Sequence, residues 1–182
     1  MLLHHNDETD GSSVMQTFLV YPDFAESARV LDRQRSGKQR VETFQLLNAI
    51  DGKTRGWANH PAAVMWRGHE AALAEYGVVV CQDWISRGYK DTMLPRLEAI
   101  RDEKIAESGL VMPPWLGDPE FHLSHQSNLV RKLPEFYSPL FPGVPDNLPY
   151  IWPTTTGGTH EDQDSGKSRT SGLLVGSTSG LR

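Results

Sequence analysis

A basic segment, residues 29–40, holds the side chains best suited to binding an anion. It contains five Lys or Arg residues and one acid, Asp32, although the whole chain has 18 Lys and Arg, 23 Asp and Glu, and a net charge of −5. Guanidinium and ammonium groups at short spacing can contact successive phosphates, and Arg can do so with two hydrogen bonds. A solvated corner between two helices has the same pattern, so the residues alone leave both interpretations open. The predicted phosphate contacts are Arg33, Arg35, Lys38 and Arg40.

A second group of candidate residues lies in and beside the loop at residues 53–60. Asn59 could read the edge of a base, and Trp57 or His60 could stack on an exposed base. The structural alternative is that Asn59 or His60 caps the following helix while Trp57 packs in the core. Neighbouring cations would extend the basic surface if the helices on either side of the loop pack together. The predicted nucleic-acid contacts of this region are Arg55, Asn59, His60 and Arg67.

Other residues that could bind a metal or act as a nucleophile form no recognisable site. His122 and His125 are three residues apart and can share a helix face, but no Cys pair or His-Glu-x-x-His pattern accompanies them. A polar, partly buried helix face is the simpler interpretation. Cys81 lies in an apolar run without a neighbouring cation, which predicts an inert thiol. We therefore expect neither a metal nor a cofactor.

The elements that position these residues are predicted to be helices, because apolar residues recur at helical spacing along most of the chain. Ser36 and Gly37 are expected to separate a first helix, capped by Asp23, from a second one. On the second helix, the basic residues lie off the apolar stripe. That stripe consists of Val41, Phe44, Leu47 and Ile50.

Later helices are bounded by Pro, Gly and Asp. Pro61 begins a third helix that Gly77 is expected to end, so residues 78–86 would form a separate buried helix. Asp91 caps the next helix, and a last helix runs over residues 119–132. The inward residues of that last helix are expected to be Leu123, Val130 and Leu133. The predicted class is all-α, a compact single-domain bundle of about five or six helices.

Composition predicts three parts of the chain. Residues 1–14 are polar and are expected to be either a disordered leader or a non-native segment before a true start at Met15. Residues 15–153 form the domain, and residues 154–182 are expected to be a disordered tail because they offer little apolar surface to bury. The single Cys favours the reducing cytoplasm, and the lack of an 18-residue apolar run argues against a membrane span.

Three stretches resemble the phage-type pyrimidine-dimer DNA glycosylases in order and pattern. They are residues 31–41, residues 54–61 with the sequence Thr-Arg-Gly-Trp-Ala-Asn-His-Pro, and residues 83–92. With the last helix, the similarity spans about residues 15–137 and is that of a divergent bacterial member. The resemblance implies an all-α domain that binds double-stranded DNA on a basic concave face and displaces a nucleotide at a lesion. It also implies chemistry without a metal, in which the N-terminal amine attacks the sugar C1′ with the help of a glutamate.

This chain departs from the family at both catalytic positions. Gln16 would follow a start at Met15, and removal of an initiator methionine normally needs a small second residue. The family's glutamate aligns with Arg35, which leaves Asp32 and Glu42 as the nearest carboxylates and the candidate catalytic residues. The predicted function is DNA binding, with base-excision repair of damaged pyrimidines as the enzymatic reading. The alternatives are a non-catalytic nucleic-acid-binding module on this scaffold and, third, an enzyme acting on a small anion or nucleotide.

Overall fold

The computed structural model describes residues 15–154 and the pair Thr159–His160. The expected leader, residues 1–14, and most of the expected tail lie outside the described residues. Within them the predicted all-α class is confirmed, because the only strands are β1 (Trp152–Pro153) and β2 (Thr159–His160), which pair antiparallel. The helices are α1 (Phe24–Arg29), α2 (Arg33–Ile50), α3 (Pro61–Trp66), α4 (Glu70–Ser86), α5 (Leu94–Ser108), α6 (Pro119–Lys132) and α7 (Pro134–Tyr137).

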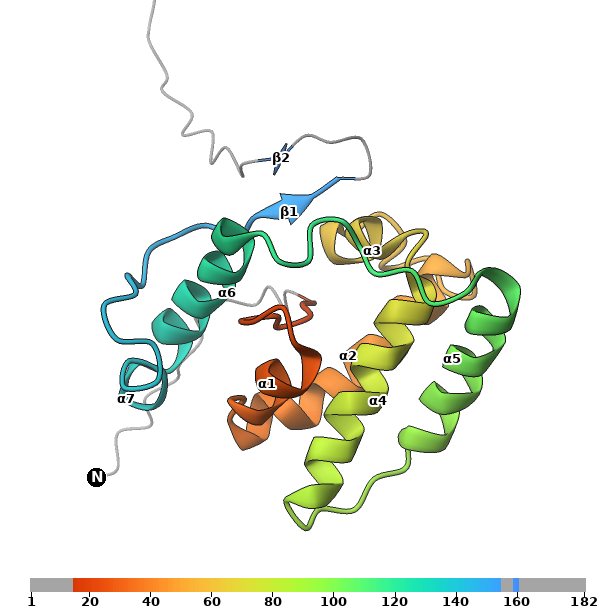
Figure 1. Ribbon diagram of the computed structural model, residues 1–182, viewed down its shortest axis with the longest axis horizontal. Coiled ribbons are helices and arrows are strands. Elements are labelled where there is room, and N and C mark those ends of the chain that lie inside the picture. Colours follow the sequence, from red (N-terminus) through yellow and green to blue (C-terminus); the bar gives the residue numbers. More distant parts are fainter. Residues whose placement is uncertain (1–14, 155–158, 161–182) are drawn as a thin grey trace, which may run out of the picture.

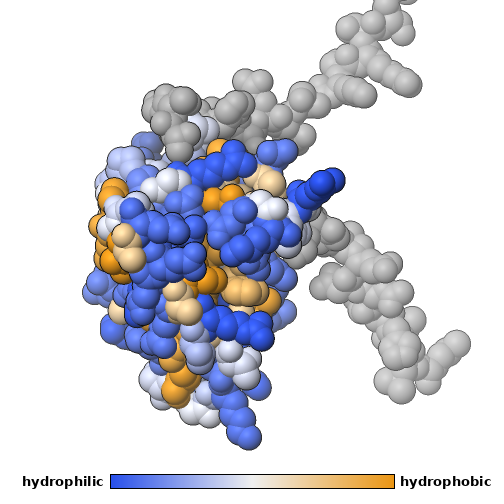
Figure 2. Space-filling model, turned by 90° about the vertical axis from the view of Figure 1, so that its right-hand side faces the viewer, coloured by the Kyte–Doolittle hydropathy of each residue, from blue (hydrophilic) through white to orange (hydrophobic). Residues whose placement is uncertain are grey.

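The helices form two groups around an extended N-terminal segment. In Figure 1, α4 packs against α5, α2 and α1 on one side of the molecule, whereas α6 and α7 lie on the other side. Residues 15–20 pass between these groups and are buried at every position. None of the described helices is long and apolar enough to cross a membrane. The face in Figure 2, where α5 lies, is mostly hydrophilic with small hydrophobic areas between the polar side chains.

The expected break at Ser36 and Gly37 is wrong, because α2 runs without interruption from Arg33 to Ile50. A Cβ atom on Gly37 would lie 3.3 Å from Cη2 of Trp84, so the glycine allows α4 to approach α2 rather than ending a helix. The expected apolar stripe is also wrong at its first residue, because Val41 is 41% exposed. The buried face of α2 is largely polar and includes Ser36, Gln39, Glu42 and Thr43.

The helix predicted from Pro61 to Gly77 is in fact interrupted after Trp66, where α3 ends. His60 caps α3 by accepting a hydrogen bond from the backbone N–H of Ala62, as one of the two predictions for this cap required. The chain then turns at Gly68, where φ is +82°, and α4 continues through Gly77. A Cβ atom on Gly77 would lie 2.7 Å from Cγ2 of Thr43, so this glycine marks the point where α4 contacts α2. Gly77, which was predicted from the sequence to end a helix, is instead needed because α4 and α2 approach each other closely at this position.

The last long helix begins and ends where it was predicted. Asp118 caps α6 by accepting a hydrogen bond from the backbone N–H of Glu120. Its inward face differs from the prediction at Leu123, which is 37% exposed. The buried residues of α6 include Phe121, His122, Ser124, His125, Asn128 and Leu129. The helix is therefore turned so that its polar face meets the extended N-terminal segment.

Candidate functional site

The buried segment at residues 15–20 is held by side chains instead of by a neighbouring strand. The side-chain amide of Gln39 uses all of its hydrogen-bonding positions there. Its oxygen accepts from the backbone N–H of Phe18 at 3.0 Å and from the Tyr76 hydroxyl at 2.7 Å. Its nitrogen donates to the carbonyl of Gln16 at 2.7 Å and to Oε2 of Glu42 at 2.9 Å. Gln39 thus fixes the Glu42 carboxylate relative to the N-terminal segment.

Two histidines of α6 hold the other side of this segment. Nδ1 of His125 accepts from the backbone N–H of Leu19 at 3.0 Å. Nδ1 of His122 lies 2.8 Å from the carbonyl of Leu19, while its Nε2 accepts from the N–H of Gly117 at 2.9 Å. Burial lowers the pKa of His122 and lowers the pKa of His125 to about 3, so both rings are neutral near pH 7.

These bonds give the histidine pair a structural role. No group of three or more potential metal-binding residues occurs in the part of the chain that the structure describes. Cys81 is fully buried, and burial, with the nearby Asp91 carboxylate, raises its thiol pKa to about 12. The prediction of an inert thiol is consistent with this environment.

An open hollow of about 910 Å³ lies on the first turns of α2. It contains both candidate catalytic carboxylates and two of the predicted phosphate contacts. Its apolar lining comes from Val41 of α2 and Trp84 of α4. The lining residues are Asp32, Arg33, Gln34, Gly37, Lys38, Val41, Glu42, Gln45 and Trp84.

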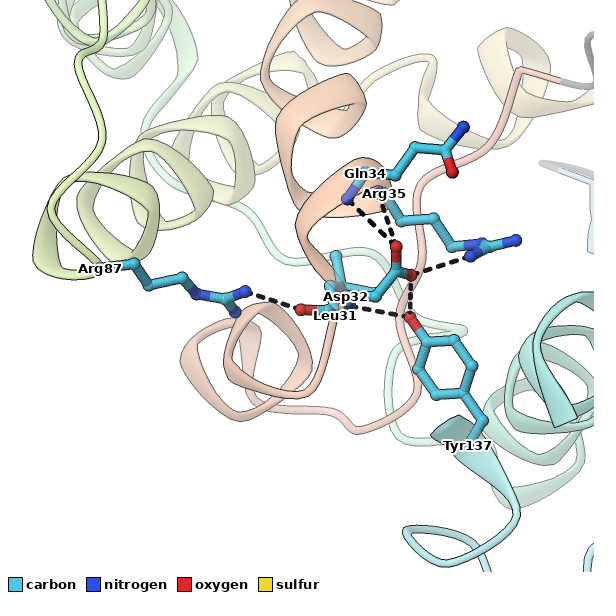
Figure 3. Close-up of polar contacts among 6 residues, drawn as sticks. All are labelled: Leu31, Asp32, Gln34, Arg35, Arg87 and Tyr137. Carbon is cyan, nitrogen blue, oxygen red and sulfur yellow. Dashed lines mark hydrogen bonds and ion pairs between the residues drawn. The ribbon is translucent and has the colours of Figure 1, made fainter. Parts of the chain in front are cut away.

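Asp32 is a structural residue in this hollow (Figure 3). Its carboxylate accepts from the backbone N–H groups of Gln34 and Arg35 and so caps α2. It also accepts from Nη1 of Arg35 at 2.9 Å and from the hydroxyl of Tyr137 at 2.5 Å. Burial alone would raise the pKa of Asp32, but the hydrogen bonds from Tyr137 and Arg35 and the charge of Arg35 lower it. The group is thus held ionised and committed to four donors.

Glu42 is the carboxylate that remains suited to proton transfer. Burial raises its pKa above the usual 4.5, and the charge of Lys38 and the hydrogen bond from Gln39 offset this only in part. Nζ of Lys38 lies 3.7 Å from Oε1 of Glu42. A carboxylate with a raised pKa in the lining of a hollow is a typical general base.

The predicted phosphate contacts differ in their availability. Arg35 pairs with Asp32, and Lys38 pairs with Glu42 while 56% of its side chain stays exposed. Arg40 is only 14% exposed, pairs with Asp91 and lies over the ring of Trp84, a geometry that argues against the predicted phosphate contact. Among the described residues, Arg33 has no carboxylate partner.

The second group of predicted contacts lies at the opposite end of α2. Because α2 has 18 residues, its ends are about 27 Å apart, and Arg55 and Asn59 follow the end distant from Arg33. Both are exposed. His60 lies between the rings of Trp57 and Trp152, caps α3, and has its pKa lowered by burial, which favours the structural interpretation.

Arg67, the last of these predicted contacts, donates to the carbonyl of Ala58 and so closes the loop. The structure therefore does not bring the two predicted groups together into one surface. The hollow contains only the group from α2.

Several residues at the hollow were not among the predicted site residues. Tyr89 lies under the guanidinium of Arg33, and Arg87 donates to the carbonyls of Leu31 and Ala28 at the end of α1. Both belong to the stretch 83–92, which the family resemblance had marked without assigning roles. Tyr137 lies at the end of the region of resemblance, but no local pattern indicated its role, because its contact with Asp32 joins residues 105 positions apart.

Comparison with known proteins identifies the segment that carries this site. The family model described as pyrimidine dimer DNA glycosylase matches residues 15–96, somewhat less than half of the 182-residue chain. No curated protein and no solved structure matches the chain. The resemblance drawn from the sequence is thus confirmed over residues 15–96: this segment, which holds the entire lining of the hollow, matches the family model of the pyrimidine dimer DNA glycosylases.

Proposed function

We propose that the protein binds damaged duplex DNA through a domain spanning residues 15–153 and removes a damaged pyrimidine at the hollow on α2. One observation carries this proposal. Glu42, a carboxylate whose pKa is raised by burial, lies in a hollow with cations at its edge, inside the segment that the family model matches. DNA is the substrate class that the family implies.

In the proposed reaction, Arg33 and Lys38 contact phosphates beside the lesion, and the damaged nucleotide enters the hollow. Damage weakens pairing and stacking, so the nucleotide leaves the duplex at lower cost. Glu42 then accepts a proton from a water that adds to the sugar C1′. The bond between C1′ and the base breaks, and the base takes up the electron pair and a proton; in a cyclobutane dimer it stays bonded to the neighbouring pyrimidine. Gln39 keeps Glu42 oriented through its hydrogen bond.

The proposal contains no step through an N-terminal amine. Met15, the first residue that the family model matches, is 3% exposed. A Schiff base at its nitrogen would need that atom to reach the sugar, so we assign hydrolysis of the glycosidic bond alone. The product would be an abasic site in an uncut strand.

A second candidate function is a non-catalytic module that binds DNA on the same scaffold. The burial of Met15 favours it, because this removes the nucleophile that the family resemblance implies. One experiment separates the two candidates: the purified protein is incubated with a duplex containing one cyclobutane dimer, and binding and the formation of an alkali-labile abasic site are measured together. Formation of the abasic site supports the enzyme, binding without an abasic site supports the module, and no binding contradicts both.

A further inference from the structure

Four side chains form a continuous stack beside the hollow. Cζ of Arg33 lies 5.0 Å from the ring centroid of Tyr89. The rings of Tyr89 and Trp84 follow, with centroids 4.2 Å apart and planes inclined by 31°. Cζ of Arg40 lies 4.3 Å from the ring of Trp84 at the inner end. Arg33 and Arg40 come from α2, whereas the two rings come from the end of α4 and the loop after it.

The inner end of this stack is firmly anchored. Arg40 pairs with Asp91, whose side chain is fully buried. Asp91 in turn accepts from the backbone N–H groups of Met93 and Leu94 and so fixes the start of α5. Nε1 of Trp84 donates to the carbonyl of Lys90 at 2.9 Å, which closes the loop that carries Tyr89. Tyr89 therefore rests on a rigid base.

The outer end of the stack has a different character. Arg33 is exposed, lines the hollow and has no carboxylate partner among the described residues, whereas Arg35, Lys38 and Arg40 each have one. A long, unpaired arginine loses rotamer freedom when it binds an anion. Stacking on Tyr89 restrains the guanidinium before any ligand arrives, while its N–H groups stay free.

We infer that Tyr89 is a positioning residue that holds the guanidinium of Arg33 at the edge of the hollow for contact with a DNA phosphate. This inference rests on the proposed DNA binding and adds to it a residue that acts only through Arg33. The aromatic ring of Tyr89, and not its hydroxyl, carries the effect. Phenylalanine at this position therefore preserves it, whereas leucine removes it.

A double-mutant cycle tests the inference. Dissociation constants for a dimer-containing duplex are measured from 50 to 300 mM salt for wild type, Tyr89→Phe, Tyr89→Leu, Arg33→Ala and the double variant Tyr89→Leu/Arg33→Ala. Tyr21→Leu is the matched control, because Tyr21 is a partly buried tyrosine that packs on Phe141, away from the hollow. Thermal melting checks that each variant is folded.

We expect Tyr89→Leu to weaken binding about two- to fivefold, the loss of an exposed cation–π contact, and Tyr89→Phe and Tyr21→Leu to bind like wild type. In the Arg33→Ala background, Tyr89→Leu should have no further effect on affinity. The double variant should show the same flattened salt dependence as Arg33→Ala. If Tyr89→Leu weakens binding equally in both backgrounds, or Tyr89→Phe weakens it as much, the inference is wrong and the proposed function stands. If Arg33→Ala binds like wild type, the DNA contact proposed for Arg33 is wrong, and the inference falls with it.

Discussion

The hydroxyl of Tyr137 donates a 2.5 Å hydrogen bond to Oδ1 of Asp32 and accepts one from the backbone N–H of the same residue at 2.9 Å. One hydroxyl thus joins α7 to the first turn of α2, two elements far apart in the sequence (Figure 3). It also helps to hold the carboxylate that caps the helix bearing the hollow. The family model ends at residue 96, so this support comes from outside the matched segment.

We predict that Tyr137→Phe destabilises the fold by about 1.5–3 kcal/mol, the range for a hydrogen bond to a charged group. Asp32 would keep its bonds to Arg35 and the backbone, so the variant should still fold. Urea denaturation at pH 7 measures the change. A loss below about 0.5 kcal/mol would show that the hydroxyl does not support the cap.

The histidine pair on α6 predicts a loss of stability in mild acid. The pKa of folded His125 is about 3, below the ordinary 6.5, so between these values the unfolded chain binds a proton that the folded chain does not. Stability is therefore complete above pH 6.5 and falls as the pH drops toward 3, by about 1.4 kcal/mol per pH unit for His125 alone. His122, whose pKa is also lowered, adds to the slope.

The control for this effect is His125→Asn, whose side-chain oxygen can still accept the N–H of Leu19 but does not titrate. Denaturation midpoints at pH 7 and pH 5 should differ clearly less in this variant than in wild type. Equal differences in both proteins would remove His125 from the acid response.

We predict that substitution of Gly77 destabilises the fold through steric clashes between helices. Its missing Cβ atom would lie 2.7 Å from Thr43 and 2.9 Å from Cδ1 of Leu97, so Gly77→Ala forces two neighbouring helices apart. We expect a loss of about 1–3 kcal/mol despite the better helix propensity of alanine. Gly56→Ala is the control, since nothing lies within 4 Å of that position, and it should change stability little. Thermal denaturation compares the two.

We predict that substitution of Arg40 lowers stability, whereas substitution of Arg33 lowers DNA affinity. Arg40→Met leaves the buried Asp91 carboxylate without its partner, which should cost about 3–5 kcal/mol of stability. Arg33→Glu should leave stability nearly unchanged and reduce both DNA affinity and its salt dependence. Denaturation and binding curves for both variants check this. If Arg40→Met is as stable as wild type and the salt dependence of its DNA binding is reduced, Arg40 contacts a phosphate after all.

The helical class and the ends of α6 were predictable, because both depend on local signals such as the Asp118 cap and the Pro that follows it. The course of α2 was not, because Gly37 is compatible with a turn and only the approach of Trp84 explains it inside a helix. The basic segment could likewise be identified from the sequence, but the ion pairs that its side chains form could not. Arg40 and Asp91 are 51 residues apart, and no local pattern shows that this pair neutralises one of the four cations.

The choice between the two carboxylates also needed the fold. Asp32 and Glu42 were equivalent candidates in sequence, yet one is fixed by four donors and the other lies buried beside Gln39. The raised pKa of Glu42 follows from its burial, which no local sequence pattern around Glu42 indicated.

The decisive measurement is the single-turnover rate at which a dimer-containing duplex gains an alkali-labile abasic site, with wild type, with Glu42→Gln, and with Glu103→Gln on the exposed side of α5 as the matched control. We expect wild type to break the glycosidic bond and leave a strand that only alkali cuts. Its rate should fall in acid as Glu42 becomes protonated, and because burial raises the pKa of Glu42, this fall should begin at a higher pH than for an ordinary glutamate. Glu42→Gln should lower the rate about 10²–10⁴-fold with the dissociation constant nearly unchanged, while Glu103→Gln matches wild type. Equal rates for wild type and Glu42→Gln, or a strand cut without alkali through an adduct that borohydride traps at the N-terminus, would contradict the account.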